Sequence, residues 1–414
     1  MNKKNAMILA MGALLAALIV VIVYTLGGDG SDSDGNDDYI SSHEDPTKPR
    51  PGRAGKAGGP APGASTAAIQ LERYRKWALY PPHSRPLHAG MVDLIQPYKV
   101  TRRAQVVYIS GGKGCKRGPD GRVTCETPPR ASDIRCALQP ESNNSFGTAD
   151  FRVELRCFRP HDGGEKLLPV EIEKAVMRLR VLGKPRPTLP PIARGDTGTN
   201  GDRKAKDLIY TFLIRPTSKD WGALDLTVHL TVEGLKHVIR ADWFSTPHQV
   251  AEIRGNMHDY RRGGHLWLDV PVNVRKAGYF VFRANLSESE GDKNFIASAE
   301  WSGKLKSGAQ TIRFQFFGKI LRDKNPETPF RVSMIRGRRL NEPVTPDMVL
   351  EASRGGKPLP EDVKYTEPQI EFIKPGPEHL TEKYEITDFS AEEWKSADKD
   401  NRIKFLRQLV REEH

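Results

Sequence analysis

Cysteine is scarce in this chain of 414 residues, and the few that occur exclude several kinds of site. There are four, all in the stretch from Cys115 to Cys157, and no pair has the C-x-x-C spacing. That spacing is typical of metal and thiol-redox sites, so we expect neither here. Because no cysteine precedes Cys115, a lipid-modified cysteine directly after a signal peptide is excluded as well.

An even number of cysteines favours disulfides instead. Cys136 is in phase with the apolar residues of "DIRCAL", and Cys157 is in phase with those of "FRVELRCF". Alternate residues of a strand share a face, so both cysteines should point to the core from neighbouring strands. We therefore predict a Cys136–Cys157 bond, which leaves Cys115 and Cys125 to close the loop "CKRGPDGRVTC".

Catalytic motifs are also missing. The sequence has no G-x-S-x-G elbow, and neither "GGKGCKRG" nor "GDTGTNGD" completes the phosphate-loop pattern. Ser396 and Lys399 fit S-x-x-K without the motifs that accompany it, and the spacing of His258 and His265 suits neither a helical nor a strand metal pair. The sequence thus predicts a protein that is not an enzyme and that has no metal site or cofactor.

Long apolar runs are absent except for one, Ala6 to Leu26, which carries no charge over 21 residues. As a helix it would span about 31 Å, close to the thickness of a hydrocarbon core of about 30 Å. It is longer than the apolar part of a signal peptide and lacks a small-x-small cleavage site, while Lys3 and Lys4 precede it. These features predict an uncleaved single-pass anchor in the inner membrane, with the N-terminus inside and the remainder periplasmic or extracellular. Nucleic acid is then not an expected partner.

Runs of four or more basic residues do not occur, although the net charge is +12. Residues 70–414 hold 58 basic and 45 acidic side chains. The excess could attract anionic lipid headgroups or an acidic polymer. Alternatively, the bases are dispersed on strand faces, where they keep the protein soluble and guard sheet edges. The sequence favours the second interpretation and leaves the first open.

Apolar and polar residues alternate along most of the chain, which is typical of half-buried strands. Seven such segments lie in residues 100–245 and six more in residues 246–341. We therefore predict an all-β fold of two antiparallel immunoglobulin-like β-sandwiches, with an N-terminal transmembrane helix and a short C-terminal helix. The predicted regions are a stub and anchor (1–28), a disordered Gly/Asp/Pro-rich linker (29–66), a short helix and extended lead-in (67–99), the first sandwich with its disulfides (100–245), the second sandwich (246–341) and a C-terminal tail (342–414).

The stretch "KSGAQTIRFQFFGKILRD" illustrates the pattern. Phe314 and Phe316 fall on one face of a strand and Arg313 on the other, and the alternation breaks at Phe317 and Gly318, as at a bulge or a strand end. We expect the two phenylalanines in the core, and Arg313 with Lys319 as solvated side chains on the strand.

The tail should end in a helix. Ser390 and Glu393 match a capping box, and Ile403, Leu406 and Val410 form an apolar stripe at helical spacing. The stripe either fastens the tail to the protein's own sandwich or binds a partner. Trp267, Tyr260 and Tyr279 are further candidate binding residues for a sugar or a peptide, although Trp267 could equally lie beneath the tail.

An ordered set of short motifs marks the second sandwich. It comprises Gly278-Tyr279, Ile296-Ala297, Gly308-Ala309-Gln310-Thr311, Phe316, Gly318-Lys319-Ile320, Arg322-Asp323 and "RGRRLNE" from Arg336. In these motifs the chain resembles extracytoplasmic bacterial proteins of the choice-of-anchor X type. The resemblance implies immunoglobulin-like modules outside the membrane and no catalytic residues. The chain departs from it at "NPETPF", where such proteins tend to have Gly-Pro-Tyr.

Together these features predict a membrane-anchored periplasmic protein with a binding or scaffolding role in the bacterial cell envelope. Its partner would be an unknown envelope protein. One alternative is a module that binds an anionic glycan or cell-wall polymer, and another is an envelope hydrolase with a site between the two domains.

Overall fold

The structure, a computed structural model, describes residues 65–110, 116–117, 123–124, 126, 130–181, 184–185, 193–289, 294–341, 348, 351–352, 355–356 and 369–413. The chain divides into two compact units, Met1–Ile69 with Val344–Val363, and Gln70–Pro343 with Lys364–His414. Every strand among the described residues belongs to the second unit.

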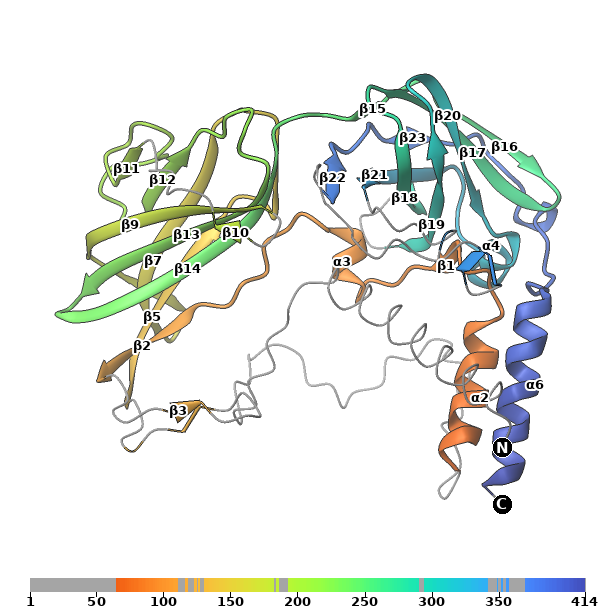
Figure 1. The fold of residues 1–414 in the computed structure, drawn as a ribbon, viewed down its shortest axis with the longest axis horizontal. Coiled ribbons are helices and arrows are strands. Elements are labelled where there is room, and N and C mark those ends of the chain that lie inside the picture. Colours follow the sequence, from red (N-terminus) through yellow and green to blue (C-terminus); the bar gives the residue numbers. More distant parts are fainter. Residues whose placement is uncertain are drawn as a thin grey trace. The chain divides into compact units, whose positions relative to one another are not determined.

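Most of the described chain is β-structure, and nearly all strand pairs are antiparallel, as predicted (Figure 1). The exception is the parallel pair of β6 with β14. Two hydrophobic cores exist, and each lies between two sheets in a sandwich-like arrangement.

The N-terminal sandwich surrounds the first core. One sheet has five strands in the order β10-β9-β13-β14-β6, and the other has six, β11-β12-β7-β5-β2 with β8 beside β7. The strands are β2 (Gln105–Ser110), β5 (Arg130–Pro140), β6 (Asn144–Phe146), β7 (Phe151–His161), β8 (Gly164–Leu168), β9 (Val170–Val181), β10 (Lys184–Pro185), β11 (Ala193–Gly195), β12 (Tyr210–Ile214), β13 (Gly222–Val232) and β14 (Leu235–Thr246). A separate ribbon joins β3 (Lys116–Arg117) to β4 (Val123–Thr124).

The hairpin of β13 and β14 shows how sequence sets this fold. Alternate residues of β13, from Leu224 to Val232, are buried, and the residues between them face outward. The connecting turn has only two residues, Glu233 and Gly234, both with positive φ (46° and 75°). That backbone matches the right-handed twist of the flanking strands, and glycine adopts it without a steric penalty.

The predicted disulfide is confirmed. Cys136 on β5 lies directly opposite Cys157 on β7, and the two sulfur atoms are bonded. Both cysteines are fully buried, which agrees with their apolar phase in the sequence. Cys115 and Cys125 lie outside the described residues.

The C-terminal sandwich surrounds the second core. One sheet has the order β1-β19-β18-β21-β22 with β23 beside β21, and the other consists of β15, β16 and β20 around β17. The strands are β1 (Ser84–Pro86), β15 (Ala251–Ile253), β16 (His258–Arg262), β17 (His265–Val274), β18 (Gly278–Glu288), β19 (Phe295–Leu305), β20 (Gly308–Phe316), β21 (Phe330–Leu340), β22 (Ile370–Ile373) and β23 (His379–Leu380).

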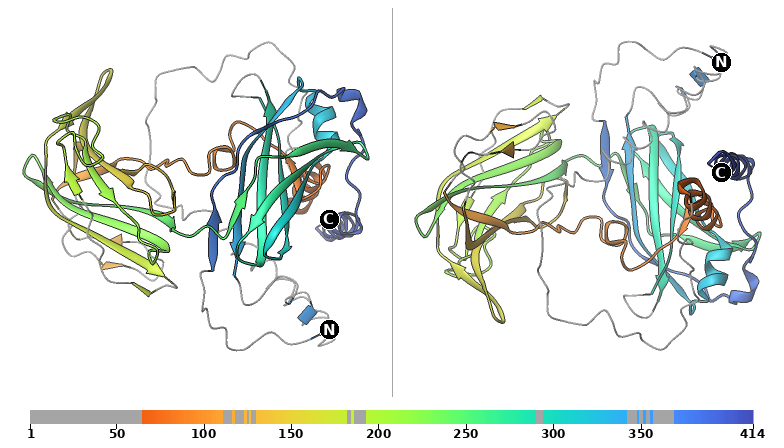
Figure 2. Two further views of the ribbon diagram at one scale, coloured as in Figure 1. Left: turned by 90° about the horizontal axis from the view of Figure 1, so that it is seen from above. Right: turned by 90° about the horizontal axis from the view of Figure 1, so that it is seen from below.

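Short helices accompany the sheets. They are α2 (Thr66–Trp77), α3 (Val92–Ile95), α4 (Gly318–Lys324), the 3-10 turn η1 (Ile386–Asp388) and α6 (Ala397–Glu412). From Gln70 onward α2 runs beside α6 in both figures, and the N–H of Trp394, just before α6, donates to the carbonyl of Leu79, just after α2 (Figure 2). The predicted C-terminal helix is thus present as α6.

Two local predictions need correction. The N-cap of α6 is Ser396, whose side chain accepts the N–H of Lys399, and not Ser390. Ser390 instead donates its backbone N–H to the carbonyl of Gly264, a tertiary bond that holds this segment out of the helix. Lys319 does not lie on a strand, because β20 ends at Phe316 and Lys319 is in α4, where its ammonium pairs with Asp323 four residues on.

The predicted location in the inner membrane is also corrected. None of the helices within the described ranges is long and apolar enough to cross a bilayer. The longest, α6, has 16 residues, or about 24 Å, and carries many charges. The predicted anchor, residues 6–26, lies outside the described residues.

Candidate functional site

The outer face of the sheet formed by β16, β17 and β20 gathers aromatic and charged side chains in two rows. Strand register places Tyr260, Trp267 and Gln315 side by side in one row. His258, Asp269 and Arg313 form the next row, two residues along each strand. We call these six residues the aromatic face.

Alternation explains why this face stays at the surface. In β17 the residues Leu266, Leu268 and Val270 are buried, so Trp267 and Asp269 between them point away from the core. In β20 Phe314 and Phe316 are fully buried as predicted, which leaves Arg313 and Gln315 outside. The same apolar pattern that builds the core therefore determines the aromatic face.

Hydrogen bonds hold the rings of the aromatic face in place. The indole Nε1–H of Trp267 donates to the carbonyl of Arg262 at 3.0 Å. The ring of Tyr260 stacks on His258 at a centroid distance of 5.6 Å, and its hydroxyl lies 3.4 Å from Asp269 Oδ1. Both aromatic rings are half-buried, so each presents a surface to solvent without being free to rotate.

A two-point ion pair fixes the charged row. Arg313 Nε and Nη2 donate to the two carboxylate oxygens of Asp269 at 2.6 and 2.9 Å. These bonds hold the pKa of Asp269 below its usual range, and the pKa of Arg313 is raised in return. Arg313 also lies over the ring of Tyr260, 5.9 Å from its centroid. Arg313 is thus an exposed side chain on the strand, as predicted, and it is also paired with Asp269.

Two neighbours extend this surface. His83 Nε2 and Gln315 Oε1 are 2.7 Å apart, which brings the lead-in before β1 to the edge of the aromatic face. Nearby, His265 stacks on Phe317 and accepts the N–H of Gly318 through Nδ1 at 3.0 Å. A side chain at Gly318 would collide with the carbonyl of Gly264, so the close approach of these segments requires glycine here.

The other predicted binding residues lie elsewhere. Tyr279 is on β18, in the opposite sheet, so it does not join Trp267 and Tyr260. On α6, Leu406 is 2% exposed, while Ile403 and Val410 are half-buried. The apolar stripe of α6 is thus turned inward, and the exposed aromatic residue of this helix is Phe405. The segment that crosses the β16–β17 turn is Asp388–Ser390, which precedes α6.

A buried polar cluster was not predicted from the sequence. Asp259 on β16 is 7% exposed and accepts three hydrogen bonds from the tail: from His379 at 2.6 Å, from the Tyr384 hydroxyl at 2.6 Å and from the N–H of Glu382 at 3.1 Å. Burial, and then the bond to Asp259, raise the pKa of Tyr384. The cluster fastens the tail to the sheet. Its only signal in the sequence is an acid at a core-facing position of a strand.

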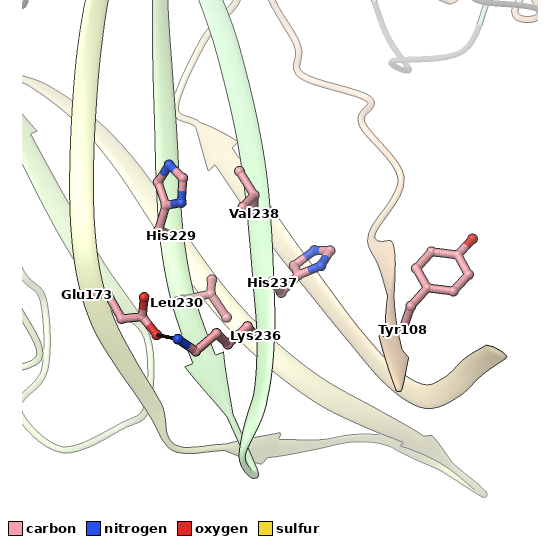
Figure 3. A pocket seen from close by; sticks show the side chains of 7 residues that line it. All are labelled: Tyr108, Glu173, His229, Leu230, Lys236, His237 and Val238. Atoms are coloured by element: carbon pink, nitrogen blue, oxygen red, sulfur yellow. Dashed lines mark ion pairs between the residues drawn. The ribbon is translucent and has the colours of Figure 1, made fainter. Parts of the chain in front are cut away.

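A small pocket occurs in each sandwich among the described residues. One, of about 300 Å³, lies in the N-terminal sandwich and is lined by Tyr108, Glu173, His229, Leu230, Lys236, His237 and Val238 (Figure 3). The other, of about 420 Å³, lies in the C-terminal sandwich beside Lys324, whose ammonium donates to the carbonyls of Leu87 and Phe295. Within the described part of the chain, no group of three or more His, Cys, Asp or Glu side chains is arranged to hold a metal ion.

Comparison with known proteins adds little. No protein-family model matches this chain, and no curated protein is significantly similar to it. Among solved structures, the chain is similar to a DUF4785 family protein from Legionella pneumophila subsp. pneumophila str. Philadelphia 1, with 11% identity and a TM-score of 0.35 over 62% of this chain and 84% of that one. So distant a likeness supports no conclusion about fold or function.

Proposed function

We propose that this chain is a non-enzymatic binding or scaffolding protein, built from two immunoglobulin-like β-sandwiches, that contacts its ligand through the aromatic face. Two sheets around each core and the antiparallel pairing of nearly all strands support the immunoglobulin-like assignment. One feature differs from antibody domains: Cys136 and Cys157 join neighbours in one sheet, whereas the antibody disulfide joins the two sheets.

The observation that carries the proposal is the fixed arrangement of rings and polar groups on the outer face of one sheet. Trp267 and Tyr260 offer apolar area at low entropic cost, because their hydrogen bonds already hold them. Gln315 and the Asp269–Arg313 pair add directional donors and acceptors beside the rings. A saccharide ring, which has an apolar face and hydroxyls at its edge, fits this combination.

The test is affinity electrophoresis of the full chain in gels that contain a neutral polysaccharide (hydroxyethylcellulose) or an anionic one (alginate). Tyr260→Ala and Trp267→Ala should each abolish the retardation. Tyr279→Ala is the matched control, because it removes a half-buried aromatic ring from the opposite sheet. If all three variants migrate alike in every gel, the aromatic face is not the binding surface.

The excess of basic residues supports a second candidate, a module for anionic polymers. In that case alginate alone should retard the protein, moderate salt should abolish the effect, and the aromatic variants should behave as the parent does. The two candidates therefore give opposite results with the same variants.

A further inference from the structure

The N-terminal sandwich has an open sheet edge at β14. On one side β14 pairs with β13 along its whole length. On the other side it pairs with β6, and only over Phe244–Thr246. Residues 235–243 of β14 therefore pair with no strand on that side within the described part of the chain.

Hydrogen-bond directions identify which backbone groups are free at this edge. The N–H of Phe244 donates to Asn143, and the carbonyls of Asp242 and Thr246 accept from Arg102 and Gly147, all away from β13. Because the N–H and C=O of one residue point the same way in a strand, and the direction alternates, Lys236, Val238 and Arg240 also direct theirs to the open side. No hydrogen bond to these groups is found among the described residues.

The side chains at this edge are suited to an extended partner. Lys236, Val238 and Arg240 are all exposed, and Val238 retains 46% of its surface in contact with solvent. Beside the edge is the 300 Å³ pocket, whose lining includes His237 on β14 and Tyr108 on β2 (Figure 3). Tyr108 and Ile109 are 45% and 50% exposed, so apolar surface is concentrated here.

Charge selects the kind of strand that can bind. Lys236 forms only a long ion pair with Glu173, at 4.0 Å, and both side chains are well exposed, while Arg240 has no ionic partner among the described residues. Two-fold pairing with a second copy of this chain, centred on Val238, would place Lys236 opposite Arg240. Like charges directly opposite one another destabilise a strand pair, so in this register the two basic residues favour an acidic partner over a second copy.

We propose that β14 binds an acidic, extended peptide segment of a partner protein by antiparallel strand addition. The partner's backbone would bond to Val238 and its neighbours, and acidic side chains would lie opposite Lys236 and Arg240, four residues apart. Between these acidic residues, an outward-facing apolar residue of the partner would lie beside Val238. Inward-facing apolar residues next to it would contact the pocket beside His237. This surface is on the other sandwich from the aromatic face, so the inference does not depend on the function proposed above.

The test uses fluorescent peptides titrated with the full chain and followed by anisotropy at low salt. Acetyl-TEVVVET-amide should bind about tenfold or more tightly than acetyl-TKVVVKT-amide, since two cross-strand charge pairs change from attractive to repulsive. The double variant Lys236→Glu/Arg240→Glu should reverse this preference. Lys166→Glu/Lys204→Glu is the matched control: it alters net charge equally, at exposed positions away from β14, and should keep the preference for the acidic peptide.

Backbone pairing is tested on the peptide, so that folding of the protein is unaffected. In antiparallel addition the central valine exchanges both of its backbone bonds with Val238, whereas its neighbours direct their N–H groups away. N-methylation of the central valine should abolish binding, and N-methylation of the valine before it should not. The proposal is overturned if neither parent peptide binds, if acidic and basic peptides bind equally, or if the two methylated peptides behave alike. The Trp267→Ala protein should bind the acidic peptide as the parent does, which separates this site from the aromatic face.

Discussion

In one sheet of the C-terminal sandwich, short strands from the lead-in and the tail cover both edges, whereas in the N-terminal sandwich most of β14 pairs with no strand on one side. β1, from the lead-in before the sandwiches, pairs with the edge strand β19. At the opposite edge β22 and β23, from the tail, pair with β21. These covering strands have only two to four residues each, and such short edges offer little to a further strand.

The same contrast holds for how polar groups are used. The tail is fastened to the C-terminal sandwich by Asp259, which is buried and accepts three bonds. In the N-terminal sandwich the charged groups lie mainly on outer faces, as in the pairs of Arg159 with Asp133 and Glu233. Exposed pairs contribute little to stability, so this sandwich depends more on its core and on the Cys136–Cys157 bond. The comparison indicates that the sheet of β19, β18 and β21 is closed by the chain's own lead-in and tail, and that the sheet ending in β14 remains available at an edge.

The largest expected effect is the loss of stability when Phe314, in the core of the C-terminal sandwich, is truncated. This ring is fully buried between the two sheets, so Phe314→Ala should lower the free energy of unfolding by about 3–5 kcal/mol. Chemical denaturation measures the loss, and hydrogen exchange read by mass spectrometry shows where it falls. Peptides from β17 and β20 should exchange faster, while peptides from β13 should not change.

A neighbouring residue provides the control. Gln315 has the opposite orientation on the same strand, so Gln315→Ala should change the free energy of unfolding by less than about 0.5 kcal/mol. Faster exchange in β13 of the Phe314→Ala protein would show that the two sandwiches do not have separate stabilities, and the contrast drawn above would lose its basis.

The alternation of apolar and polar residues made the strands predictable from sequence. The sheet edges and the long-range hydrogen bonds were not predictable in this way. Each of the thirteen alternating segments corresponds to a strand, because a buried face requires period two. The strands that were missed, such as β1, β16 and β23, are short and held by their partners more than by any pattern of their own. The disulfide was predictable because both cysteines share the phase of the core.

The candidate site was predictable only in part. The sequence shows that Trp267 belongs to the outward-facing residues of β17. Its neighbours Tyr260 and Gln315 are determined by strand register, which the alternation of apolar and polar residues does not reveal. Tyr279 shows the limit of such reasoning, since an outward phase does not tell which sheet carries the residue. The three bonds to Asp259 span more than 100 residues in sequence, a separation over which local signals carry no information.

A smaller effect is expected from loosening the tail at Asp259. Asp259→Asn retains the shape of the side chain but removes one acceptor oxygen, so a buried donor from His379 or Tyr384 loses its partner. The free energy of unfolding should fall by about 1–3 kcal/mol, the cost of an unsatisfied buried group. Amides of residues 379–384 should exchange faster, and trypsin should cleave after Lys383 sooner than in the parent.

Asp388→Asn supplies the comparison for that experiment. Asp388 also joins the tail to β16, through Arg261 at 3.6 Å, but both side chains are 45% exposed. Loss of this pair should cost less than about 1 kcal/mol. Equal effects of the two variants would mean that Asp259 does not hold the tail, and that the edge of β21 is covered by other contacts.

The smallest expected effect is a pH dependence from His265. Burial, and then the nearby His83, lower the pKa of His265, and its Nδ1 accepts the N–H of Gly318, a bond that a protonated ring could not form. The unfolded chain therefore binds a proton at a higher pH than the folded protein. As pH falls below about 6.5, the usual pKa of histidine, the free energy of unfolding should decrease until the folded pKa is reached.

His265→Asn should reduce this slope in the C-terminal sandwich. His237, whose pKa burial lowers in the same direction, lies in the N-terminal sandwich, so His237→Asn should reduce the slope there instead. Hydrogen exchange at pH 7.5 and pH 5.5, compared for β17 and β13, separates the two contributions. If His265→Asn changes hydrogen exchange in both sandwiches equally, the two sandwiches do not have independent stabilities, and the contrast between them loses its basis.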